Sequence, residues 1–166
     1  MADIILSNAE IAEIYERNIA TVYRVCFMYF KHHTQDLEDA VSETFLKLLL
    51  HKKQFNGEEH QRAWLIVTAS NICKNMLTSY WKRKVDVEEE PVIASLPIET
   101  DETLQCILAL PEKLKISVYM YYYEGYSADE IGRAIGKSTN SVWGYLHKGR
   151  GLLKQILLEA EDGKQN

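Results

Sequence analysis

The chain has 166 residues, of which 46% are hydrophobic and 26% are charged, and its formal net charge is −5. This composition is typical of a soluble globular protein and excludes an intrinsically disordered chain. No apolar run approaches the roughly 18 residues of a transmembrane helix, and no secretory signal is visible, so we expect a cytoplasmic protein without membrane insertion. Cys26, Cys73 and Cys106 are widely spaced, and we interpret them as small buried hydrophobic residues.

The charge is distributed in blocks along the chain. Residues 1–46 carry three basic and eight acidic side chains, and residues 47–84 carry eight basic and two acidic ones. Residues 85–102 carry seven acidic side chains and no basic one, and residues 103–166 carry eight basic and seven acidic ones. A local basic segment can bind phosphate groups while the whole chain stays acidic. The negative net charge therefore does not exclude a nucleic-acid partner.

Helical periodicity dominates the first half of the chain. Apolar residues recur at spacings of three and four from Ile11 to Phe30, which predicts an amphipathic helix. A second helix is predicted to begin at Asp36, because its acidic first turn suits the positive end of a helix dipole. The apolar face of this second helix is predicted to comprise Leu37, Val41, Phe45, Leu48 and Leu49.

A turn and a long third helix follow. Residues 54–59 contain Asn56-Gly57 and predict a turn or loop. The third helix is expected from about His60 to Lys84. Its inward-facing side chains are predicted to be Trp64, Val67, Ile72, Met76 and Tyr80.

The second half of the chain begins after an acidic stretch. Residues 85–100 contain two prolines and lack a helical period, which predicts a linker. Helices resume over residues 101–110, Pro111 is expected as the first residue of the next helix, and Gly125 as the cap near its end. The predicted fold is all-α, with small helical domains at residues 1–84 and 101–166 joined by the acidic linker.

Residues 127–146 have the pattern of a helix-turn-helix. Ser127 and Glu130 form a capping box ahead of a short helix that stops at Gly136, and a last helix is predicted from Ser138 or Thr139 to about Glu159. The inward residues of the motif are predicted to be Ile131, Ile135, Val142 and Leu146. In such motifs the outward residues of the second helix reach base edges in the major groove, and nearby basic residues hold phosphates. The candidate DNA-binding residues are Lys137, Ser138, Thr139, Asn140, Ser141, Trp143, Gly144, Tyr145, His147, Lys148 and Arg150.

An alternative interpretation of this segment is a helical hairpin in a bundle whose exposed face is simply polar. Four basic residues and no acidic one lie between Lys137 and Lys154, which favours DNA binding. Gly149 and Gly151 are expected to weaken the last helix, at a cost of about 1 kcal/mol each relative to alanine.

Two separate parts of the chain resemble one family, the extracytoplasmic-function type of RNA polymerase sigma factor in the sigma-70 superfamily. Residues 122–136, preceded by Leu110-Pro111, resemble the helix-turn-helix of region 4, which reads the minus-thirty-five element. Residues 36–48 resemble the acidic helix of region 2, which docks on the clamp helices of the largest polymerase subunit. Residues 62–77 resemble the part of region 2 that recognises and melts the minus-ten element. Ser42 and residues 143–145 depart from the family pattern.

The resemblance implies two further sets of residues. The polymerase-binding residues would be Asp36, Glu38, Asp39, Glu43, Phe45 and Lys47. The minus-ten residues would be Asn56, Arg62, Trp64, Asn71, Lys74, Asn75, Thr78, Ser79, Trp81, Lys82 and Arg83. An acidic helix suits a basic partner, and a basic helix with amide, hydroxyl and aromatic side chains suits unpaired nucleic acid. The alternatives are a solvated acidic face and a Trp64 that belongs to the core.

The expected function is that of a sigma factor, not an enzyme. Its expected partners are core RNA polymerase, promoter DNA and an anti-sigma factor, without a cofactor, a metal or a small-molecule substrate. One alternative is a DNA-binding regulator that forms no holoenzyme. A catalytic alternative finds little support, because His32, His33, His51 and His60 show no metal-ligand or general-base spacing.

Overall fold

A computed structural model describes residues 6–31, 33–51, 54–83 and 102–164. These residues form helices and connecting turns, without a strand among them, so the predicted all-α fold is confirmed. The chain separates into two compact units, residues 1–98 and residues 99–166. None of the helices in the described ranges is both long and apolar enough to cross a membrane.

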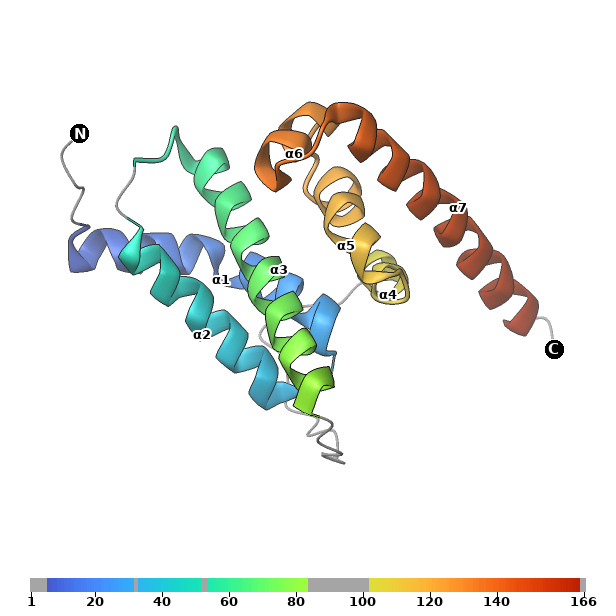
Figure 1. Cartoon of the computed structure of the whole chain (residues 1–166), viewed down its shortest axis with the longest axis horizontal. Coiled ribbons are helices and arrows are strands. Elements are labelled where there is room, and N and C mark those ends of the chain that lie inside the picture. Colours follow the sequence, from blue (N-terminus) through green and yellow to red (C-terminus); the bar gives the residue numbers. More distant parts are fainter. Residues whose placement is uncertain (1–5, 32, 52–53, 84–101, 165–166) are drawn as a thin grey trace. The chain divides into compact units, whose positions relative to one another are not determined.

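The first unit is built from helices α1 (Asn8–Phe30), α2 (Thr34–Leu50) and α3 (Glu58–Arg83), which pack against one another in all three pairings (Figure 1). Helix α1 begins with a capping box in which the Ser7 hydroxyl accepts a hydrogen bond from the Glu10 backbone N–H. Helix α2 begins two residues before the predicted Asp36. The predicted inward face of α1 is largely confirmed. Tyr15, which the spacing of the apolar residues also places on that face, is 46% exposed and contacts the Phe45 ring.

The inward face of α3 differs from the prediction. Its fully or nearly fully buried stripe consists of Leu65, Ile66, Ala69, Ile72 and Cys73. The predicted Trp64, Val67 and Met76 are only partly buried, and the Tyr80 side chain lies outside the described residues. Since α3 packs against both α1 and α2, its buried face is set by two neighbours and not by a single apolar stripe.

The cysteines are free thiols. Cys26 and Cys73 are fully buried, as expected, and Cys106 is partly buried. A hydrogen bond with the Cys26 thiol, together with burial, raises the pKa of the Cys73 thiol well above its ordinary value. The Cys73 thiol therefore stays protonated, and both buried cysteines pack as small core residues.

The second unit contains α4 (Glu102–Leu108), α5 (Glu112–Val118), the π-helical turn η1 (Tyr119–Tyr123), α6 (Ala128–Ile135) and α7 (Thr139–Lys164). Helix α7 packs against α4, α5 and α6. Pro111 is the residue before α5 and not its first residue, and α7 extends five residues beyond the predicted Glu159. The predicted glycine near the end of the α5 segment is confirmed, because Gly125 adopts φ +81° after η1.

Gly149 is needed where α7 crosses α5, which the sequence did not predict. A Cβ atom at Gly149 would lie 2.4 Å from Cγ2 of the fully buried Val118. The two helices therefore approach more closely than any other residue would allow. Gly151 meets open space, so the expected weakening of α7 still applies to that position.

Candidate functional site

The helix-turn-helix of α6 and α7 is held by local hydrogen bonds that the sequence predicts. Ser127 and Glu130 form the predicted capping box, with both hydrogen bonds at 3.1 Å. Gly136 is left-handed, with φ +71°, and the Lys137 backbone N–H donates to the Gly132 carbonyl. A Cβ at Gly132 would lie 2.6 Å from the Lys137 carbonyl oxygen. Glycine at both positions therefore lets α6 turn sharply into α7.

Two hydroxyl groups at the start of α7 are engaged within the motif. The Ser138 Oγ accepts a hydrogen bond from the Ser141 backbone N–H at 3.1 Å. The Thr139 Oγ1 donates to the Asp129 Oδ1 at 2.6 Å, which joins the first and second helices of the motif. These contacts set the angle at which α7 leaves the turn, so Ser138 and Thr139 have a structural role beside any contact to DNA.

The predicted inward and outward faces of α7 agree with the structure. Val142 and Leu146 are buried, as is Ile131 of α6, whereas Ile135 is only partly buried. Thr139 and Tyr145 are partly buried. The other candidate DNA-binding residues are exposed, namely Lys137, Ser138, Asn140, Ser141, Trp143, Gly144, His147, Lys148 and Arg150. The structure thus brings the candidate set together on one surface of α7 and its preceding turn.

Helix α2 presents the candidate polymerase-binding residues. Glu38, Asp39, Glu43 and Lys47 are exposed, and Asp36 is partly buried in the first turn. Phe45 is partly buried, with its ring centroid 4.8 Å from that of Tyr15. The acidic residues lie in the first half of the helix, where the helix dipole favours negative charge.

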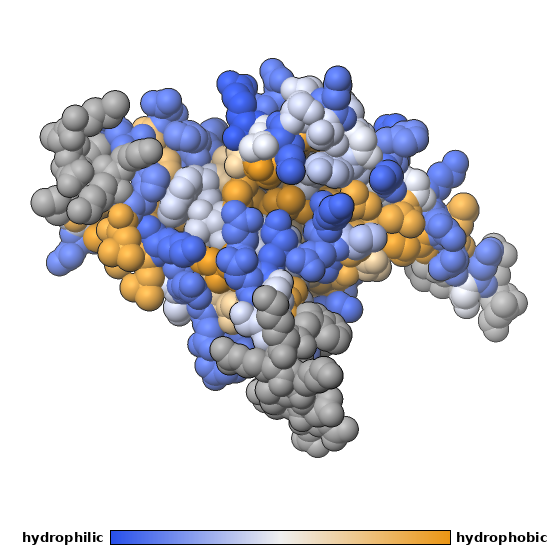
Figure 2. Space-filling view, in the orientation of Figure 1, coloured by the Kyte–Doolittle hydropathy of each residue, from blue (hydrophilic) through white to orange (hydrophobic). Residues whose placement is uncertain are grey.

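Exposed leucines continue this surface of α2, and sequence reasoning did not identify them. Leu46 is 57% exposed, Leu50 is 76% exposed, and Leu49 is also exposed. Figure 2 shows hydrophobic side chains gathered over the C-terminal end of α2. Asp39, Glu43, Leu46 and Leu50 recur at spacings of four, three and four, so they lie along one stripe. The predicted inward position of Leu49 is therefore wrong, since Leu49 is 49% exposed, whereas the sequence prediction assigns Leu46 and Leu50 to neither face.

An aromatic cluster holds the loop before α3. The His51 ring stacks on Phe55 at 4.7 Å and lies 4.6 Å from Trp64. The Asn56 backbone N–H donates to His60 Nδ1 at 2.9 Å. Trp64 thus belongs to the partly buried cluster that supports the loop and not to the fully buried core of the unit.

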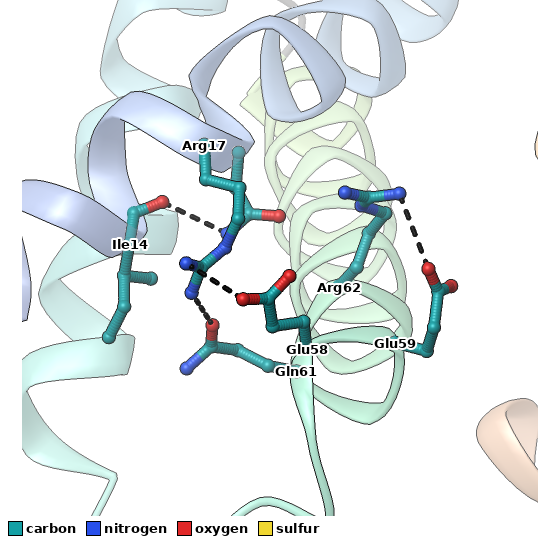
Figure 3. A network of polar contacts seen from close by, with 7 residues as sticks. Ile14, Arg17, Glu58, Glu59, Gln61 and Arg62 are labelled. Atoms are coloured by element: carbon teal, nitrogen blue, oxygen red, sulfur yellow. Dashed lines mark hydrogen bonds and ion pairs between the residues drawn. The ribbon is translucent and has the colours of Figure 1, made fainter.

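A polar network ties α1 to the start of α3 (Figure 3). The Arg17 guanidinium donates to Gln61 Oε1 at 3.1 Å and forms an ion pair with Glu58 at 3.2 Å. Arg62 points away from this pair, toward Glu59 at 3.7 Å, and its buried Nε has no hydrogen-bond partner. Arg17 was not identified from the sequence, because the residues it contacts lie more than forty positions away along the chain.

The remaining minus-ten candidates lie on α3. Asn71, Asn75, Thr78 and Ser79 are exposed, and Lys74 is partly buried. The Thr78 hydroxyl donates to the Lys74 carbonyl at 2.9 Å. Asn71, Asn75 and Thr78 follow one another at spacings of four and three, so they share a face. The side chains of Trp81, Lys82 and Arg83 lie outside the described residues.

The described residues contain no group of three or more His, Cys, Asp or Glu side chains that could hold a metal ion. His51 and His60 are used in the aromatic and loop contacts described above. His32 lies outside the described residues, and His33 precedes α2.

The sequence matches two family models, sigma-70 region 2 over residues 14–83 and sigma-70 region 4 over residues 100–153. The chain belongs to the sigma-70 family of sigma factors. The predicted membership of the extracytoplasmic-function type and the predicted function as a sigma factor are confirmed. Sigma factors are transcription regulators. The unit of residues 1–98 is called the region 2 unit below, and that of residues 99–166 the region 4 unit.

The chain is similar to several characterised sigma factors. It is 25% identical to the RNA polymerase sigma-H factor of Pseudomonas aeruginosa over 147 residues, which cover 77% of this chain and 76% of that protein. It is 24% identical to the ECF RNA polymerase sigma factor SigW of Bacillus subtilis over 169 residues, covering 90% and 88%. The fold resembles that of the sigma factor RpoE from Bartonella quintana, crystallised with the anti-sigma factor NepR. That similarity has a TM-score of 0.67 and 14% identity, and covers 88% of this chain and 95% of that one.

Proposed function

We propose that this sigma factor divides its work between residues 1–84, which dock on core RNA polymerase and bind the opened minus-ten element, and residues 101–166, which read the minus-thirty-five duplex. Residues 85–100, whose acidic composition suits a solvated chain, would connect them. The observation that carries this proposal is the presence of two surfaces in one chain. One is the acidic and apolar stripe of α2, and the other is the outward face of α7 in a helix-turn-helix.

The stripe of Asp39, Glu43, Leu46 and Leu50 supports the docking role. Its acidic half attracts a basic surface and raises the rate of encounter, and its leucines lose water when a partner covers them. Large exposed apolar side chains beside polar ones are typical of protein-binding sites. A partner with a basic region next to an apolar one fits this stripe, and core polymerase is the partner that we assign to it.

The exposed face of α3 supports a role at the minus-ten element. Asn71, Asn75 and Thr78 can hydrogen-bond to base edges, and the basic residues of the segment can bind the backbone of a single strand. The loop at Phe55 and Asn56 is held by the aromatic cluster and by His60, so it keeps its shape. A held loop lowers the entropy cost of capturing an unpaired base.

The exposed candidates on α7 support a role at the minus-thirty-five element. The N-terminal turns of a second helix in such a motif enter the major groove, with basic residues placed against the phosphates. Lys148 and Arg150 are exposed beyond the first turns of α7 and can contact the backbone on either side of the groove.

We further propose that the protein acts in the cytoplasm, has no catalytic activity of its own and is restrained by an anti-sigma factor. The resemblance to RpoE, which was crystallised with an anti-sigma factor, supports a partner of this kind. The exposed leucines of α2 offer one surface that such an inhibitor could cover to prevent polymerase docking.

Binding to core polymerase without any resident sigma tests the proposal. The purified chain should co-elute with core polymerase on a sizing column as a stoichiometric complex. A variant carrying Asp39→Lys and Glu43→Lys should lose the complex, because it reverses the charge of the acidic half of the stripe. Leu46→Asp with Leu50→Asp should also lose it.

The matched control reverses two exposed acidic residues of α1, Glu13→Lys and Glu16→Lys. This control has the same net charge as the Asp39 and Glu43 variant and should still bind core polymerase. If wild type forms no complex, the DNA-binding regulator without a holoenzyme becomes the better explanation. If the α2 variant binds as well as the α1 control, the docking surface lies elsewhere.

A further inference from the structure

A small aromatic surface lies beside the recognition helix of the region 4 unit. Trp143 of α7 is 50% exposed and Tyr122 of η1 is 43% exposed. Between them lies Tyr121, whose ring centroid is 5.8 Å from that of Trp143 and 4.9 Å from that of Tyr122. Both contacts are edge-to-face, the geometry that aromatic pairs prefer. Three rings from two elements therefore support one another at the protein surface.

Trp143 stands at the border of the outward face of α7. Val142 and Leu146 point inward and are buried. At 3.6 residues per turn, Trp143 lies about a quarter turn from Val142, and Gly144 lies about half a turn from it. Gly144 is therefore near the middle of the outward face, with Asn140 one turn before it.

Gly144 leaves open space on the outward face of α7. It is exposed, and apart from its chain neighbours and its own turns of helix no atom lies within 4 Å of the position that a Cβ would take. Nothing within the region 4 unit requires glycine there, in contrast to Gly149, which meets Val118. A base-pair edge can thus approach the helix backbone at Gly144, one residue after the exposed Trp143.

The indole ring is held in place before any DNA arrives. Tyr121 contacts it edge-to-face, and Tyr121 lies on a π-helical turn, a distortion that is frequent at functional sites. A side chain that is already held loses less conformational entropy on binding. Trp143 is thus able to contribute its apolar surface to recognition at low cost.

The chemistry of the major groove limits what an apolar ring can recognise. Among the four bases the C5 methyl group of thymine is the apolar group presented there, and the other readable groups are hydrogen-bond donors and acceptors. We infer that Trp143 selects a thymine in the minus-thirty-five duplex by packing against its methyl group. This inference rests on the proposed function of the region 4 unit.

A substitution of thymine by deoxyuridine tests the inference, because it removes only the methyl group. The full chain in complex with core polymerase is first used to select a preferred minus-thirty-five sequence from duplexes randomised in that segment. Each thymine of the selected duplex is then replaced singly by deoxyuridine, and the affinity is measured. At one position at least, wild type should lose affinity about fourfold, the effect of burying one methyl group.

Trp143→Ala should bind the selected duplex more weakly and should no longer distinguish thymine from deoxyuridine at that position. Trp143→Gln, which keeps a long side chain but no apolar ring, should behave in the same way. Lys148→Ala is the matched control on the same helix. It should weaken binding to all duplexes and reduce the salt dependence, yet keep the fourfold preference for thymine.

The outcomes separate the inference from the proposed function. If no minus-thirty-five sequence is enriched, the proposed function of the region 4 unit is wrong and the inference falls with it. If a sequence is enriched but wild type is indifferent to every methyl group, the inference alone is overturned. It is also overturned if a folded Trp143→Gln protein keeps the thymine preference, because another side chain then contacts the methyl group.

Discussion

The two units hold their candidate surfaces in different ways. In the region 4 unit, the recognition helix follows a capping box at Ser127, a left-handed Gly136 and the Ser138 cap, all within twelve residues of chain. In the region 2 unit, the start of α3 depends on a contact that is distant in sequence, because Arg17 of α1 reaches Gln61 of α3 across 44 positions. The loop before α3 is held by His51 and Phe55, whose rings stack on each other and pack against Trp64 of α3.

The orientation of α7 as it leaves the turn is thus set by hydrogen bonds between residues close in sequence, whereas the surface at the start of α3 is set by tertiary packing. A helix-turn-helix must present one helix at a constant angle; in the region 4 unit adjacent caps set the turn into α7, while packing on α5 holds the rest of that helix. A loop that captures an unpaired base needs a shape that short segments do not hold alone, so it takes its support from neighbouring helices. Variants that remove each kind of support should therefore affect the units separately.

The largest effect is expected at Gly149, the one close tertiary approach described above for the region 4 unit. Gly149→Ala places a methyl group 2.4 Å from Val118 Cγ2, and overpacking of this kind costs about 1–3 kcal/mol or more. The region 4 unit should unfold at a lower urea concentration, and the region 2 unit should be unaffected. Circular dichroism in urea, with tryptophan fluorescence for each unit, measures this.

A double-mutant cycle with Val118→Ala controls for the cause. Val118→Ala alone destabilises the core but removes the clashing Cγ2 atom. In that background Gly149→Ala should be neutral or stabilising, because alanine is the better helix former. An equal loss in both backgrounds would show that the close approach of α5 and α7 is not the reason for the glycine.

The second largest effect is expected at Arg17, which ties α1 to the start of α3 in the region 2 unit. Arg17→Ala removes the donor to Gln61, a side chain that is only 8% exposed, and an unsatisfied buried acceptor costs about 1–3 kcal/mol. Urea unfolding should show this loss in the region 2 unit, and binding to minus-ten single strands should weaken while minus-thirty-five binding is unchanged.

Glu58→Gln is the matched control for Arg17. It removes the ion pair at 3.2 Å but keeps the hydrogen bond to Gln61, and exposed ion pairs are worth roughly 0–1 kcal/mol. It should be nearly neutral for stability. A loss as large as that of Arg17→Ala would mean that the ion pair, and not the bond to Gln61, holds the start of α3 against α1.

A smaller effect is expected at Ser127, the local cap of the region 4 unit. Ser127→Ala should cost about 1 kcal/mol, as loss of an N-cap generally does. Hydrogen bonds from the Ser127 backbone and side chain lower the pKa of Glu130. The stability contributed by the ionised Glu130 carboxylate is therefore fully present above the ordinary glutamate pKa of about 4.3. It is lost as the pH falls through the lower pKa that Glu130 has in the folded protein.

The pH dependence of unfolding checks this assignment. Wild type should lose part of its region 4 stability below about pH 4.3, and Glu130→Gln should lose less over the same range. Ser7 and Glu10 form a second capping box in the region 2 unit, with the same direction of pKa shift for Glu10. Ser7→Ala is therefore the matched cap removal, and it should leave the region 4 unit unchanged.

The comparison also explains which features the sequence could predict. The roles of Ser127 and Glu130 in the capping box and of Gly136 in ending α6 depend only on neighbouring residues, and the structure confirms all three roles. The role of Gly149 does not depend on neighbouring residues. The sequence predicted only that Gly149 weakens the helix, because the side chain that requires a glycine there is Val118, 31 positions earlier in the chain and on another helix.

Long-range packing also accounts for the errors in the region 2 unit. The inward face of α3 was assigned from one periodic stripe, but α3 packs against two helices, and Leu65 and Ile66 lie between them. Arg17, Leu46 and Leu50 were missed because their importance depends on which surfaces remain open after packing. Periodicity predicts that a helix forms, but it does not identify the neighbours that cover it.

The smallest effect has the opposite sign and concerns Gly144. Gly144→Ala meets no atom within 4 Å, so it should stabilise the region 4 unit by about 0.5–1 kcal/mol. The same methyl group occupies the open space through which DNA would approach the backbone and should weaken minus-thirty-five binding several-fold. Gly151→Ala also meets open space but lies two turns further along α7, so it should stabilise the unit without weakening binding. Equal binding by both variants would show that DNA does not approach α7 at Gly144. A stabilised protein that binds DNA less well is an outcome that a purely structural role for this glycine does not predict.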